Sequence, residues 1–162
     1  MRIKAAVAWR AGAELSIEDV DLDDPRDDEI LVRVEAVGVC HTDDNARLGR
    51  LPVVFPIILG HEGAGVVERV GSRVSRVRPG DRVLFTPDYC GRCEQCTLGL
   101  TPYCDEVVAV TFTAFIPRLL ELHARGRFPV DRLVRNYPFA EVNTAIADSL
   151  AGVTVKPVLT FG

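Results

Sequence analysis

The segment I-L-V-R-V-E-A-V-G-V, residues 30–39, decides the fold class because apolar and polar side chains alternate along it. Two charged residues, Arg33 and Glu35, fall on one face of the extended chain. The opposite face carries the apolar residues Ile30, Val32, Val34 and Ala36. A period of two residues is the pattern of a strand with one buried face. The segment therefore predicts a half-buried β-strand.

Short runs of the same kind follow along the first hundred residues. G-V-V-E-R-V at 65–70 and R-V-L-F at 82–85 both have strand character. Between them, R-P-G-D at 78–81 is a turn sequence, because proline fixes one backbone dihedral angle and glycine readily adopts a positive φ. Several short strands at this spacing are typical of a β-barrel or a sandwich.

The period becomes helical after residue 115. One helix is predicted to end at Gly126, which is a common C-terminal stop. Its spaced positions are Ile116, Leu119, Leu120 and His123, with the histidine partly exposed. A second helix is predicted over 139–151, with Gly152 just beyond it. Its apolar side carries Val142, Ala145, Ile146 and Leu150. The final strand, 155–161, is predicted to be an edge strand because Pro157 cannot donate a ladder hydrogen bond.

Composition and charge predict one globular domain over residues 1–162. The chain is 48% hydrophobic and 26% charged, which is ordinary for a folded domain. Its net charge is -4, so it lacks the basic surface that nucleic-acid binding requires. The acidic run at 18–29 is predicted to be a solvated surface loop.

No apolar run approaches the roughly 20 residues that a membrane span requires. In the opening M-R-I-K-A-A-V-A-W-R, the apolar run A-A-V-A-W is too short for the apolar region of a signal peptide. These patterns predict a cytoplasmic protein without membrane partners. In a reducing compartment, cysteines are expected to bind metal rather than form disulfides.

Four of the five cysteines lie in C-G-R-C-E-Q-C-T-L-G-L-T-P-Y-C, residues 90–104. Zinc takes four thiolates in a tetrahedron, and a C-x-x-C turn presents two of them at chelating distance. The spacing predicts a structural zinc bound by Cys90, Cys93, Cys96 and Cys104. The alternative is a loop with unliganded thiols or disulfides.

The fifth cysteine, Cys40, lies in G-V-C-H-T-D-D-N, and His61 follows in G-H-E-G-A-G. Taken alone, such a cysteine is more often a small buried hydrophobe than a ligand. However, G-H-E-G-A-G-V-V followed by C-G-x-C-x-x-C-x-x-G-x-x-x-x-C resembles the zinc-dependent medium-chain alcohol dehydrogenases. The sequence after residue 114 is similar to the end of the same family, particularly its aryl (benzyl) alcohol members.

The resemblance implies a GroES-like catalytic domain, a partly open β-barrel with a few helices, and thus a mainly β, α+β fold. It divides the chain into an N-terminal barrel segment with the structural zinc loop, 1–104, a junction, 105–113, and a C-terminal catalytic-domain segment, 114–162. The family places a dinucleotide-binding domain of about 100 to 200 residues at that junction. No G-x-G-x-x-G occurs in the sequence. We therefore expect no Rossmann domain and no bound NAD(P).

The same resemblance implies ligands for a second, catalytic-type zinc. Cys40 and His61 resemble two of the ligands, and Glu62 resembles the acid that lies behind the metal. Asp43 would orient the His61 imidazole. The family's third ligand, a further cysteine, belongs to the missing stretch. The hypothesis is a weak site made by Cys40, His61, Glu62 and water; the alternative is an empty remnant.

Other positions match the family's reaction machinery. Thr42 resembles the hydroxyl that relays the alcohol proton, and His41 falls where the family contacts the cofactor pyrophosphate, a vestigial position here. Leu51 and Phe85 fall where the family lines its substrate pocket. Asn45 cannot titrate near neutrality, so a relay beyond Thr42 would need water.

Four functions follow from these features. The first is a zinc-binding alcohol dehydrogenase domain for small alcohols or aldehydes, without efficient hydride transfer alone. The second is a zinc-water hydrolase acting on activated esters. The third is alcohol oxidation with weakly bound NAD(P) or a nucleotide domain from another chain. The fourth is a non-catalytic, self-associating module, because removal of a domain exposes apolar surface.

Overall fold

The computed structural model describes residues 1–85, 89–106, 123–127 and 129–162. Residues 107–113 of the predicted junction and residues 116–122 of the first predicted helix lie outside this part. Eight strands are described: β1 (Arg2–Ala8), β2 (Ser16–Asp21), β3 (Ile30–Gly38), β4 (Ile57–Ile58), β5 (Glu62–Val70), β6 (Arg82–Leu84), β7 (Val134–Pro138) and β8 (Lys156–Thr160). The described helices are α1 (His41–Arg47), α2 (Glu94–Thr97) and α4 (Val142–Leu150). Short 3-10 turns are η1 (Thr101–Tyr103), η2 (Val130–Arg132) and η3 (Phe139–Glu141).

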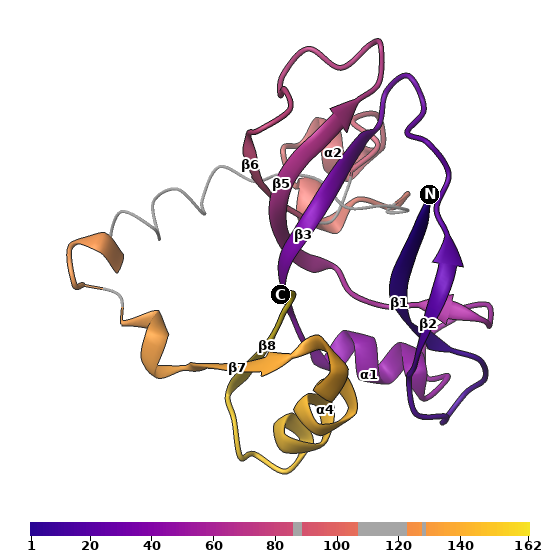
Figure 1. Ribbon diagram of the computed structural model, residues 1–162. Helices are drawn as coiled ribbons and strands as arrows, with labels where there is room; N and C mark the ends of the chain where they lie inside the picture. The colour runs from indigo at the N-terminus through magenta and orange to yellow at the C-terminus, as the bar shows by residue number, and fades with distance from the viewer. Residues whose placement is uncertain (86–88, 107–122, 128) are drawn as a thin grey trace.

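The strands form two separate sheets (Figure 1). One has the order β2-β1-β4, and the other has the order β6-β5-β3-β8-β7. Within the described ranges the strands do not close into a barrel, in agreement with the predicted mainly β, partly open architecture. No helix in the described part of the chain is both long and apolar enough to cross a bilayer.

Strand β3 is the centre of the larger sheet. It pairs antiparallel with β5 on one side and β8 on the other, and Gly38 lies opposite both Glu62 and Val158. This register is what assembles the site described below. The prediction for 30–39 is confirmed, whereas the run at 65–70 proves to be the second part of a longer strand that begins at Glu62.

The acidic run was only partly a loop, because residues 18–21 belong to β2. Basic residues of β1 face this strand: Arg2 lies opposite Asp21 and Lys4 opposite Asp19, and the Lys4 ammonium is 2.8 Å from the Asp19 carboxylate. Cross-strand pairs of opposite charge stabilise an exposed antiparallel strand. The sequence pattern alone did not reveal these partners.

Strand β8 is not an edge strand, and that prediction was wrong. It lies between β3 and β7, and Pro157 is fully buried. The Pro157 carbonyl accepts the Val39 N–H at 3.0 Å, so its nitrogen also faces β3, where the ladder ends. The missing N–H would leave the Val39 carbonyl without a donor. The Lys156 ammonium takes that place, with Nζ 3.3 Å from the Val39 oxygen.

The C-terminal helix is shorter than predicted, with η3 preceding α4. Val142, Ala145 and Ile146 are buried as expected, but Leu150 is 52% exposed. The Asn143 side chain forms two hydrogen bonds with the Leu15 backbone, at 2.9 and 3.0 Å, and so joins α4 to the N-terminal sheet.

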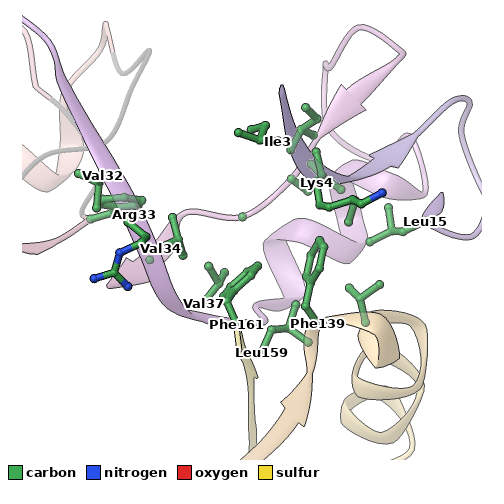
Figure 2. Close-up of a pocket in the computed structure, with 18 of the residues that line it drawn as sticks. Ile3, Lys4, Leu15, Val32, Arg33, Val34, Val37, Phe139, Leu159 and Phe161 are labelled. Carbon is green, nitrogen blue, oxygen red and sulfur yellow. The ribbon is translucent and has the colours of Figure 1, made fainter. Parts of the chain in front are cut away.

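A cavity of about 610 Å³ lies between the two sheets (Figure 2). Its lining is mostly apolar and comes from β1, β3 and the C-terminal segment, including Ile3, Val34 and Val37. Phe139 and Phe161 project into it with their ring centroids 4.8 Å apart. The two sheets therefore border an open, mostly apolar pocket rather than a continuously packed interior.

Candidate metal centre

The N-terminus of α1 holds Cys40 at the end of β3. Cys40 is the residue before the first helical turn, and its backbone N–H donates to Asp43 Oδ2 at 3.1 Å. A carboxylate at the third helical position is well placed to accept this bond. At the other end of the helix, the buried Asp44 carboxylate accepts from Arg47 at 2.7 Å, and Arg47 donates to the Ala13 carbonyl at 2.8 Å. The helix is thus fixed at both ends.

Asp43 also orients His61. Its Oδ1 is 3.0 Å from His61 Nδ1, and the residue is only 9% exposed. A carboxylate is an acceptor, so the imidazole proton lies on Nδ1 and the Nε2 lone pair is available to a metal. This is the role that the resemblance implied for Asp43.

The structure brings together the three predicted ligands of the second centre. One donor atom each from Cys40, His61 and Glu62 lies within 4.8 Å of the other two. The antiparallel register explains this, because Gly38 of β3 lies opposite Glu62 of β5, and Cys40 follows two residues later. Thiolate, imidazole and carboxylate are the donors that zinc accepts in catalytic sites, where three protein ligands leave a fourth position open. The donor set fits zinc.

Glu62 has a further partner that sequence reasoning missed. Its Oε2 forms an ion pair with Lys156 Nζ, and each of these side chains is 34% exposed. A Cβ atom at Gly38 would overlap the Glu62 carboxylate, so a larger residue there would force that side chain to move. The available signal was the proline after Lys156, because a strand proline leaves a neighbouring carbonyl in need of another donor.

The other predicted site residues lie around this centre in different ways. Thr42 is exposed, with Oγ1 3.5 Å from Cys40 Sγ, and His41 is exposed as well. Phe85 lines the inter-sheet cavity and packs over Gly63, where a Cβ would clash with its ring. Leu51 is 39% exposed in the loop after α1 and lies outside the described lining of that cavity. A pocket shared by Leu51 and Phe85 stays a prediction.

The four-cysteine loop forms a second cluster. Cys90 and Cys96 have their sulfur atoms 4.0 Å apart, and those of Cys93 and Cys104 are 3.9 Å apart. All four sulfurs lie within 4.8 Å of one another, and the four residues are free cysteines rather than disulfides. A zinc tetrahedron with Zn–S bonds of about 2.3 Å has edges of about 3.8 Å. The spacing fits zinc with no position left for substrate.

Backbone amides prepare this loop for charge. The N–H groups of Arg92 and Cys93 donate to Cys90 Sγ at 3.4 and 3.2 Å. These bonds lower the pKa of Cys90 to about 7, and the bond from the Arg92 N–H has the larger effect. Burial raises the pKa of Cys96 to about 12. The thiols of the metal-free loop therefore differ in acidity, and metal binding would displace their remaining protons.

Comparison with known proteins bears on the family of this chain. Residues 26–131 match the family model described as the alcohol dehydrogenase GroES-like domain. The chain is 45% identical over 120 residues to S-(hydroxymethyl)glutathione dehydrogenase of Komagataella pastoris, covering 72% of this chain and 31% of that protein. It is 44% identical over 109 residues to geraniol dehydrogenase of Castellaniella defragrans, covering 67% and 29% respectively. The chain thus spans about a third of the length of these curated relatives.

Solved structures agree on the fold. Benzyl alcohol dehydrogenase of Acinetobacter calcoaceticus superposes with a TM-score of 0.91 at 19% identity, over all of both chains, which bears on the fold alone. A cobalt- and zinc-bound thermostable alcohol dehydrogenase of Pyrobaculum aerophilum matches with a TM-score of 0.62 at 32% identity, over 70% of this chain and 36% of that one.

Proposed function

The chain belongs to the zinc-dependent medium-chain alcohol dehydrogenases, and on that premise we propose that it is a catalytic domain with two zinc centres. Cys90, Cys93, Cys96 and Cys104 would hold a structural zinc that stabilises their loop. Cys40, His61 and Glu62 would hold the second zinc, which would leave one position open for a primary alcohol. The observation that carries this proposal is the convergence of those three donors within 4.8 Å.

Each residue around the second centre has a separate task. Zinc there would act as a Lewis acid that lowers the pKa of the bound alcohol. Asp43 keeps the proton on His61 Nδ1, 3.0 Å away, so that Nε2 serves as the ligand. The exposed Thr42 hydroxyl, beside Cys40, accepts the alcohol proton and passes it to water. Asn45 does not titrate near neutrality, so the route continues through solvent.

The hydride acceptor would come from outside this chain. The sequence contains no G-x-G-x-x-G, the fingerprint of a dinucleotide site. We propose that the chain binds NAD(P) poorly and oxidises alcohols efficiently only with a nucleotide-binding domain. The relative named for geraniol suggests allylic primary alcohols as the substrate class, and the resemblance of the sequence after residue 114 to the aryl alcohol members of the family adds benzylic ones. A zinc-bound water acting on activated esters is the second candidate, because three protein ligands leave one position open.

Metal analysis and ligand titration test these proposals together. We expect two zinc ions per natural chain and one per chain in Cys40→Ala. Titration with NADH should quench the fluorescence of the protein weakly at most. Ester turnover that is lost in His61→Ala would favour the second candidate. One zinc per chain that persists in Cys40→Ala would refute the second centre. Tight NADH binding with rapid benzyl alcohol oxidation would refute the need for a separate nucleotide domain.

A further inference from the structure

We propose that Lys156 is a positioning residue that competes with the metal for the Glu62 carboxylate, so that the Cys40–His61–Glu62 centre binds divalent metal weakly and reversibly. The inference rests on the proposed function, which places a metal there. It assigns to Lys156 a role that concerns metal affinity rather than substrate.

The sheet register places Lys156 beside the centre. Gly38 lies opposite Glu62 in β5 and opposite Val158 in β8, so the side chains of Glu62 and Lys156 meet over the end of β3. The absence of a side chain at Gly38 leaves room for this contact as the structure has it. A Cβ there would clash with the carboxylate and would lie 3.0 Å from Lys156 Cε.

A second contact holds the ammonium in this position. Lys156 Nζ donates to the Val39 carbonyl at 3.3 Å, the acceptor that Pro157 leaves without a ladder partner. An exposed lysine on a flexible stem usually gains little from an ion pair, because holding it costs side-chain entropy. Here two acceptors and burial to 34% exposure reduce that freedom. The lysine is therefore a fixed cation at the edge of the centre.

The electrostatics set the direction of the effect. A metal bound at Glu62 would share the carboxylate with an ammonium already paired to Oε2. The two cations repel each other, and the ion pair lowers the charge that the carboxylate can offer to the metal. Orientation of Glu62 by Lys156 acts in the opposite sense, but orientation persists in part through packing against Gly38. We therefore expect a neutral residue at 156 to tighten metal binding.

The test uses cobalt(II) as the probe. The four-cysteine loop is first loaded with zinc, and cobalt is then titrated while the thiolate-to-cobalt absorption from Cys40 is followed. Cys40→Ser is the control that must abolish this signal. We expect Lys156→Met to bind cobalt about tenfold or more tightly than the natural chain. Lys156→Arg keeps the charge and should stay within about threefold of it.

A double-mutant cycle separates competition from a general structural effect. In a Glu62→Gln background, Lys156→Met should change cobalt affinity much less, because the competition acts through the carboxylate. Unchanged or weaker binding in Lys156→Met, with the cobalt signal intact, would overturn the inference. If no variant shows a cobalt absorption that is lost in Cys40→Ser, the proposed second centre itself is refuted, and the inference with it.

Folding is checked by circular dichroism for each variant. Lys156→Gln is the second neutral variant, because its amide N–H can still donate toward the Val39 carbonyl. If both neutral variants fail to fold, Lys156 is required for the structure and is not an adjustable competitor, which also overturns the inference.

Discussion

Replacement of Asp43 by alanine should destabilise the chain because it removes one carboxylate that accepts two hydrogen bonds. The side chain is 11% exposed and accepts from the Cys40 N–H at 3.1 Å and from His61 Nδ1 at 3.0 Å. Hydrogen bonds to a charged partner contribute about 1.5–3 kcal/mol each. Cys40 and His61 are half-buried, so water can replace part of the hydrogen bonding that they lose. The expected loss in the free energy of unfolding is therefore about 2–4 kcal/mol.

The matched control is Asp19→Ala. Asp19 is also paired at short distance, 2.8 Å from Lys4, but its side chain is 48% exposed. Exposed ion pairs contribute about 0–1 kcal/mol, so this variant should stay close to the natural chain. Asp43→Asn should lie between the two, because an amide oxygen can accept only one of the two bonds well.

Equilibrium unfolding in urea, followed by circular dichroism, measures these differences. Free zinc must be held constant, because a bound metal stabilises the folded state. Titration of the folded variants should also show metal binding at Cys40 and His61 weakened by about 10–100-fold in Asp43→Ala. A stability loss no larger than that of Asp19→Ala would refute the assignment of Asp43 as the shared acceptor.

Three further outcomes are expected. Cys104→Ser should lose one zinc and at least about 2 kcal/mol of stability, measured by metal analysis and urea unfolding, whereas Cys40→Ser should keep that zinc. In the metal-free chain, the pKa of Cys90 is about 7, so its alkylation by iodoacetamide should rise through neutral pH; a midpoint near the ordinary value of about 8.5 would contradict the two N–H···S contacts. Because this pKa is lowered on folding, its stabilising contribution is complete above the unfolded value and is lost as pH falls toward 7. Gly65→Ala should lower the free energy of unfolding by about 1–3 kcal/mol or more, because the added Cβ would overlap the Arg33 carbonyl. An unchanged midpoint of urea unfolding would contradict this, because it would mean that β3 and β5 can move apart at no cost.

Local patterns in the sequence anticipated much of this molecule. The period of two at 30–39 predicted the strand β3 correctly, although burial along it does not alternate: apart from exposed Arg33 and buried Gly38, its residues are half-buried on both faces. The spacing of the four cysteines likewise anticipated the cluster of sulfurs, since ligand distance within one loop depends on local chain geometry. The convergence of Cys40 with His61 came from a family resemblance, because 21 residues of spacing do not fix a distance.

The errors came from long-range partners. Pro157 suggested an edge strand because a missing N–H was treated as a defect of the whole strand, whereas its nitrogen faces the point where β3 ends. Lys156 was missed because its two acceptors, on Val39 and Glu62, are distant in the chain. Neither single-residue propensity nor periodicity carries such information. Cytoplasmic location and self-association stay predictions from the sequence.

The space between the two sheets has a consequence for mechanical compression. Pressure favours whichever state occupies less volume, and unfolding eliminates internal voids that side chains leave unfilled. The space of about 610 Å³ between the sheets opens to the surface, so solvent can fill it in the folded state. It therefore adds little to the volume decrease on unfolding, and hydrostatic pressure should disrupt this molecule no more readily than a chain of similar size without such a pocket.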